Sequence, residues 1–137
     1  LNYASYGAIV AGLNNVSDAS YASVTGGQFN RAVGSLSSVS GGNSNLASGE
    51  GSSILGGLVN TASGKESSIS GGLNNDATAL RATVAGGRIN SATENYASVS
   101  GGQSNTASGN SSTVSGGANR SVVGADDWRG GGLLQGN

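Results

Sequence analysis

The sequence predicts an all-β fold, a parallel β-roll or β-solenoid built from 15-residue coils. Three observations support this prediction. A β-branched residue recurs every 15 residues without an insertion, two small residues follow it closely, and an Asn and then an Ala mark a second segment of most repeats. The β-branched residues, called anchors below, are Ile9, Val24, Val39, Ile54, Ile69, Val84, Val99 and Val114. We therefore expect about eight regular coils in residues 1–124 and a degenerate capping segment in residues 125–137.

Each anchor is expected to lie in a short strand that ends at a glycine corner. Gly26 and Gly27 follow Val24, the same pair recurs in every later regular coil, and the first coil has Ala11 and Gly12. Glycine adopts positive φ without steric cost and lets stacked backbones approach closely. The paired glycines therefore predict a sharp corner that recurs in every coil.

The second segment of each coil follows an asparagine that lies six residues after the anchor. Its amide can satisfy backbone groups at a corner and repeat along the stack, so we predict a structural role rather than ligand binding. The eighth coil breaks the series with Arg120. The predicted ladder consists of Asn15, Asn30, Asn45, Asn60, Asn75, Asn90 and Asn105. The alanine two residues further on is expected to point inward, as the anchor does.

The residues on either side of each anchor are expected to point outward, because side chains alternate along a strand. Most of them are Ser or Thr, and stacking would arrange them in two parallel rows of hydroxyls. The candidate ligand-binding residues are Ser23, Thr25, Ser38, Ser40, Ser68, Ser70, Ser98, Ser100, Thr113 and Ser115. Ala8, Val10, Leu55 and Ala85 interrupt the rows.

Several large apolar residues fall outside the inward-facing set. They lie three residues before the anchor or five residues after it, and the latter group occurs in alternate coils. The candidate subunit-interface residues are Tyr6, Tyr21, Phe29, Leu36, Val59, Ile89 and Tyr96. Single exposed apolar residues are the alternative interpretation.

The regular pattern decays after Gly124, although Gly131 and Gly132 keep the double-glycine register. Trp128, Leu133 and Leu134 suit a cap that covers the exposed end of the apolar column and blunts a strand edge. The chain begins at Leu1 inside a coil, and we expect it to be a fragment or a processed segment.

The composition argues against several functions. The net charge is -1 and only 9% of residues are charged, which disfavours nucleic-acid binding and a polybasic membrane anchor. His and Cys are absent, so the familiar Ser-His and Cys-His catalytic systems and thiolate or imidazole zinc sites are excluded. The five acidic residues of the regular coils, Asp18, Glu50, Glu66, Asp76 and Glu94, occupy different phases of the repeat, and Asn rather than Asp follows the glycine pair. We therefore expect no enzyme, no cofactor and no calcium in the repeat body.

The repeat resembles the head repeats of YadA-like trimeric autotransporter adhesins, the Hep/Hag repeat class. The matching residues include Ser98-Val99-Ser100-Gly101-Gly102 and Asn105-Thr106-Ala107-Ser108-Gly109, and the resemblance covers about Tyr6 to Gly124. It implies a left-handed roll, a homotrimer, and attachment to a host surface protein or glycan from outside the cell. The family coil is usually a residue shorter, with Ala-Ile-Gly where this chain has Ser-Gly-Gly. A phage or injection-system tail fibre, exposed on the virion surface, is an alternative source of such a roll.

The repeat also bears a weaker resemblance to the β-roll of grass antifreeze proteins. That resemblance implies ice binding through the Ser and Thr rows, although ice-binding faces generally favour Thr and Ser dominates here. A structural spacer without a ligand is the third alternative. We expect a non-enzymatic extracellular adhesion or receptor-binding module, with ice binding and the spacer role as the alternatives.

Overall fold

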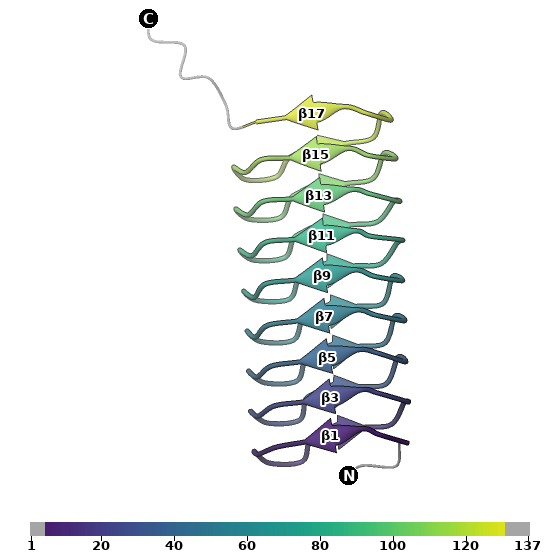
Figure 1. Ribbon diagram of the computed structural model, residues 1–137. Helices are drawn as coiled ribbons and strands as arrows, with labels where there is room; N and C mark the ends of the chain where they lie inside the picture. Colours follow the sequence, from purple (N-terminus) through teal and green to yellow (C-terminus); the bar gives the residue numbers. More distant parts are fainter. Residues whose placement is uncertain (1–4, 131–137) are drawn as a thin grey trace, which may run out of the picture.

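The computed structural model describes residues 5–130 and confirms the predicted β-solenoid. No helix occurs within this range, and the coils stack in chain order from one end of the molecule to the other (Figure 1). Each full coil contributes two strands of two residues, one containing the anchor and one containing the inward Ala or its equivalent. The handedness implied by the resemblance stays a prediction.

The strands form two parallel sheets, one on each flat face of the stack. The first sheet consists of β1 (Ala8–Ile9), β3 (Ser23–Val24), β5 (Ser38–Val39), β7 (Ser53–Ile54), β9 (Ser68–Ile69), β11 (Thr83–Val84), β13 (Ser98–Val99), β15 (Thr113–Val114) and β17 (Trp128–Arg129). The second consists of β2 (Val16–Ser17), β4 (Arg31–Ala32), β6 (Leu46–Ala47), β8 (Thr61–Ala62), β10 (Asp76–Ala77), β12 (Ser91–Ala92), β14 (Thr106–Ala107) and β16 (Ser121–Val122). Every pair is in register at 15 residues, as in Val24 with Val39.

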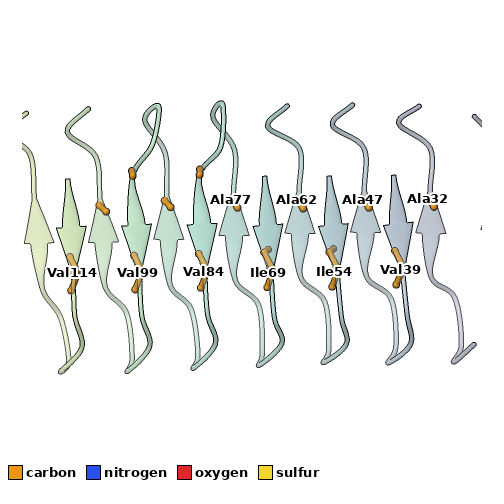
Figure 2. Packing of buried hydrophobic residues seen from close by; sticks show 14 of the residues in the cluster. Ala32, Val39, Ala47, Ile54, Ala62, Ile69, Ala77, Val84, Val99 and Val114 are labelled. Carbon is orange, nitrogen blue, oxygen red and sulfur yellow. The ribbon is translucent and has the colours of Figure 1, made fainter. Parts of the chain in front are cut away.

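The core is narrow and consists of stacked columns of small apolar side chains. The anchors from Val24 to Val114 are at most 1% exposed, and the alanines from Ala32 to Ala107 at the second inward position are fully buried. Figure 2 shows the two columns facing each other between the sheets. The alternation predicted from the sequence is therefore the arrangement found, since each two-residue strand from β2 to β16 buries its second side chain and presents the first outward.

The seven asparagines form a buried ladder beside the glycine corner. The Asn60 amide nitrogen donates to the carbonyl oxygens of Gly56 and Gly72, each at 3.1 Å. The Asn60 Oδ1 accepts a hydrogen bond from the backbone nitrogen of Asn75 at 3.0 Å. Each side chain thus joins its own corner to the next coil, which explains why the residue type recurs.

A third inward position, two residues before the anchor, is filled by Ala or Ser in the second to eighth coils. Ser37, Ser52 and Ser67 are buried there in consecutive coils, and their hydroxyl oxygens have no hydrogen-bond partner. Ala22, Ala82 and Ala97 occupy the same position elsewhere. A buried hydroxyl without a partner lowers stability, because it loses its hydrogen bonds to water.

We expect Ser52→Ala to stabilise the protein by about 1 kcal/mol. The variant removes the unpaired hydroxyl and leaves a side chain that other coils accept at this place. Ser112→Ala is the control, because the Ser112 hydroxyl accepts a hydrogen bond from the Gly109 nitrogen at 3.1 Å. Thermal and urea unfolding should show opposite changes for the two variants, and a loss of stability in Ser52→Ala would contradict this account.

Candidate binding and assembly surfaces

The first sheet presents the predicted hydroxyl rows on its outer face. Ser23, Ser38, Ser68, Ser98 and Thr113 lie half-buried in one row, and Thr25, Ser40, Ser70, Ser100 and Ser115 lie exposed in the other. The Ser98 hydroxyl donates to Thr113 Oγ1 at 3.2 Å. Around Ala85 the face has a shallow hollow of about 130 Å³, lined by hydroxyls from Ser70, Ser100 and their neighbours. The structure therefore brings the ten candidate residues together on one face.

The second sheet carries another hydroxyl face that the sequence analysis did not identify. Its outward residues flank the inward alanines, and the hydroxyls run through consecutive coils from Thr61 onward. They are Thr61, Ser63, Thr78, Ser91, Thr93, Thr106, Ser108 and Ser121. The signal for this face is the alternation of side chains along a strand, which sends the residues beside each inward alanine outward as it does those beside each anchor.

One carboxylate interrupts the second hydroxyl face. Asp76 lies between Thr61 and Ser91 in the row, and partial burial raises the pKa of its carboxyl group. A hydrogen bond with Thr61 opposes this shift but is the smaller effect. No group of three or more acidic residues within residues 5–130 is arranged to hold a metal ion.

The two connections of each coil form two narrow edges on opposite sides of the strands (Figure 1). The glycine edge consists of the fourth and fifth residues after each anchor, such as Gln28 and Phe29 after Val24. The charged edge consists of the fourth and third residues before each anchor. The predicted interface residues are divided between them: Phe29, Val59 and Ile89 lie on the glycine edge, and Tyr6, Tyr21, Leu36 and Tyr96 lie on the charged edge. These seven residues are 43–81% exposed, and because they lie on two opposite edges, no single flat contact can use all of them.

Both edges place a residue of each full coil in the left-handed backbone region. The fifth position after the anchor has φ between 54° and 57° in every regular coil, including Phe29, Val59 and Ile89. The third position before the anchor has φ between 54° and 66° throughout the described stack. Asn and Gly tolerate this conformation, whereas bulky and β-branched residues are strained in it. The sequence pattern had suggested these apolar residues but not their strained backbone.

Side chains on the charged edge stack from one coil to the next. The Tyr6 and Tyr21 rings are parallel within 8°, with centroids 5.3 Å apart. Glu66 accepts a hydrogen bond from Arg81 Nε at 2.7 Å, and the Arg81 guanidinium lies 5.8 Å from the centroid of the Tyr96 ring. Lys65 pairs with Glu50 at 3.0 Å in the same way.

We expect the pKa of Glu66 to lie below its ordinary value of 4.5, chiefly because Arg81 donates a hydrogen bond to the carboxylate and secondarily because of its positive charge. The stability that this pair contributes is therefore present above pH 4.5 and is lost as the pH falls through the folded-state pKa. NMR titration of the Glu66 carboxyl carbon should show the low midpoint in the wild type and a higher one in Arg81→Gln. Arg88→Gln, on the opposite edge, should leave the midpoint unchanged; an unchanged midpoint in Arg81→Gln would refute the pairing.

The described part of the C-terminal segment continues the stack as a ninth coil. Trp128 pairs in register with Thr113, is 69% exposed, and donates a hydrogen bond from its indole nitrogen to the Ser115 hydroxyl. Its ring therefore lies at the hydroxyl face and does not cover the end of the apolar column, which corrects the predicted role. Arg129 takes the anchor register opposite Val114, and a hollow of about 200 Å³ borders Val122 and Arg129. Leu133 and Leu134 lie outside the described residues.

Comparison with models of known protein families and a search of curated proteins both found no match for this chain. In the described range, the structure contains no helix long and apolar enough to cross a membrane.

Proposed function

We propose that the chain is a non-enzymatic adhesion or receptor-binding module that acts outside the cell or on a virion surface. The observation that supports this best is the presentation of side chains at fixed spacing on two flat outer faces of a continuous stack. Neighbouring coils lie about 4.8 Å apart, so each face offers the same small polar group many times. Such a surface suits a repeating polar partner, for which a host surface protein or glycan is the candidate class.

Binding by this module would depend on the number of contacts. A single Ser or Thr hydroxyl contributes little, but rows of them on several joined chains raise the overall affinity through effective concentration. The homotrimer implied by the resemblance is one such assembly. The exposed apolar residues on the edges support self-association. Chains that join through these edges keep both hydroxyl faces free for a partner.

The test is a binding assay of the immobilised chain against a glycan array and a panel of extracellular matrix proteins. Ser70→Lys with Ser100→Lys alters the first face, and Ser63→Lys with Thr78→Lys is the matched variant of the second face; Ser70, Ser100, Ser63 and Thr78 are exposed. We expect one of the two double variants to weaken binding about 10-fold or more, because its lysines disturb the hydroxyl face that contacts the partner. If no partner binds, the module is a spacer. Binding that both pairs of substitutions leave unchanged would show that neither hydroxyl face makes the contact.

Ice binding is the second candidate function, and the second hydroxyl face favours it. This face has Thr61, Thr78, Thr93 and Thr106 among its outward residues, which gives it more threonine than the first face. A measurement of thermal hysteresis decides between the candidates. Activity that is lost in Thr78→Lys with Thr93→Lys, and retained in Ser70→Lys with Ser100→Lys, would assign ice binding to the second face.

A further inference from the structure

The glycine edge carries two neighbouring rows whose residue types form a regular arrangement. The leading row, linked from coil to coil by parallel bridges, is Leu13, Gln28, Asn43, Leu58, Leu73, Arg88, Gln103 and Ala118. The strained row, at the next position along the chain, is Asn14, Phe29, Ser44, Val59, Asn74, Ile89, Ser104 and Asn119. In the strained row, small polar residues alternate with large apolar ones over the first seven coils.

The large members of the strained row are held at an energetic cost. Val59 and Ile89 are β-branched residues at φ of 57° and 56°, a conformation that Asn adopts readily at the same position in other coils. Their side chains are 44% and 43% exposed, so packing within the chain repays this cost only in part. Residues in sparsely populated backbone conformations cluster at functional contacts, which makes this row a candidate contact surface.

The spacing of the row restricts what can pack against it. Large residues recur every second coil, about 9.6 Å apart along the stack. A partner that fills the intervening small positions needs the same repeat distance, which another stack of β-coils has. A second copy of this chain supplies both that distance and the same row.

We propose that two copies pair along the glycine edge in antiparallel orientation, related by a two-fold axis perpendicular to the stack. Such an axis reverses the order of the coils and makes each row face its own counterpart. With all eight regular coils overlapping, the first coil of one copy faces the eighth of the other. In the strained row, this register sets Phe29 opposite Ser104, Val59 opposite Asn74, and Ile89 opposite Ser44. Each large side chain thus meets a small one.

The leading row matches in the same register. Leu58 faces Leu73 at the centre, next to Val59, and forms an apolar contact that the two-fold axis repeats. Gln28 faces Gln103 and Asn43 faces Arg88, two pairs of side chains that can exchange hydrogen bonds. Leu13 faces Ala118 at the ends. Apolar residues therefore meet apolar residues in this row, and polar residues meet polar ones.

A parallel arrangement matches apolar with apolar and polar with polar residues in only some of the coils. An axis parallel to the stack keeps the coils level and sets the leading row of one chain against the strained row of the next. Leu58 then meets Val59 and Asn43 meets Ser44, but Gln28 meets Phe29 and Arg88 meets Ile89. The edge therefore favours the antiparallel pair over the parallel trimer that the resemblance implies. This inference rests on the proposed function, because it names the partner of an assembling edge and leaves both hydroxyl faces exposed.

The pair is expected to be reversible, because an edge two residues wide buries much less than the roughly 800 Å² per partner of a standard stable interface. Sedimentation velocity and light scattering of the full chain over a wide concentration range should show a shift from one chain to two. Val59→Asn with Ile89→Asn should weaken the dimer about 10-fold or more. The same variant should keep or raise the melting temperature, because Asn relieves the backbone strain.

The control is Leu36→Asn, which changes an exposed apolar residue with φ of 62° on the charged edge. We expect it to leave the dimer unchanged. A monomer at all concentrations, or a dimer that Val59→Asn with Ile89→Asn does not weaken, would overturn the proposal.

The orientation is tested with single cysteines, since the natural chain has none. A mixture of Gln28→Cys and Gln103→Cys proteins should form a disulfide-linked dimer on mild oxidation. Gln28→Cys alone should not, because in the proposed pair the two copies of position 28 lie about 24 Å apart. Cross-linking of Gln28→Cys with itself, or a mass of three chains, would overturn the antiparallel pair. Because partner binding on the hydroxyl faces is assayed separately, failure of this pairing is distinguishable from failure of the proposed function.

Discussion

Replacing Gly57 with alanine is expected to destabilise the solenoid by about 3 kcal/mol or more. Gly57 has φ of 92°, a conformation in which an L-residue is strained. A Cβ atom there would lie less than 3.0 Å from the carbonyl oxygen of Gly72 and from the amide nitrogen of Asn60. Both atoms belong to the ladder that joins consecutive coils, so the substitution disturbs the stacking of the coils as well as the corner. Thermal unfolding followed by circular dichroism should show a decrease of roughly 10 °C in Tm.

Gly56→Ala provides a closely matched control for this prediction. Gly56 precedes Gly57 directly, has no positive φ, and a Cβ atom there would meet nothing within 4 Å. We expect this variant to remain within about 0.5 kcal/mol of the wild type. Equal losses in the two variants would show that the glycine pair is needed only for chain flexibility, and would contradict the close approach seen in the structure.

The coils, their register and their buried columns could be predicted because one period governs all three. A β-branched residue every 15 positions and an Ala eight residues later leave little choice of inward face once the chain is extended. The paired glycines also marked the corner correctly, since the second glycine of each pair has φ between 82° and 96°. Local residue type and long-range stacking therefore indicate the same structure.

The edges and the end of the stack could not be predicted in the same way. The pattern located Phe29 and Val59 outside the core, but their positive φ follows from the path of the corner and contradicts the preference of those residue types. Trp128 was expected at the end of the apolar column because it lies where the repeat decays, with Leu133 and Leu134 after it. Trp128 pairs with Thr113, whereas the next residue, Arg129, takes the anchor register opposite Val114. Because neighbouring residues of a strand point to opposite faces, the Trp128 ring lies on the outer face.

The hydrogen bonds of the asparagine ladder explain why we expect substitutions of these asparagines to lower the stability of the fold most. Asn60→Ala removes the hydrogen bonds to the carbonyl oxygens of Gly56 and Gly72 and to Asn45 Oδ1, together with the acceptor of the Asn75 backbone nitrogen. These groups are buried or partly buried, and leaving them without partners costs more than the hydrogen bonds contribute. We expect a loss of about 3 to 5 kcal/mol, measured by urea unfolding. A loss below about 1 kcal/mol would show that the ladder is not a principal source of stability.

Asn60→Asp separates the donor role of the amide from its acceptor role. The carboxylate keeps an oxygen for the Asn75 nitrogen but turns two donated hydrogen bonds into contacts between a negative charge and the carbonyl oxygens of Gly56 and Gly72. Burial and these oxygens should raise the pKa of the new carboxyl group in the folded state. A raised folded-state pKa means that the folded state binds more protons, so stability falls as the pH rises from the unfolded-state pKa to the folded-state one. The loss of stability relative to the wild type should therefore be large at pH 7 and smaller near pH 3, where the protonated carboxyl can donate one hydrogen bond. A loss of stability that does not change with pH would show that the new carboxyl group turns out of the ladder into solvent.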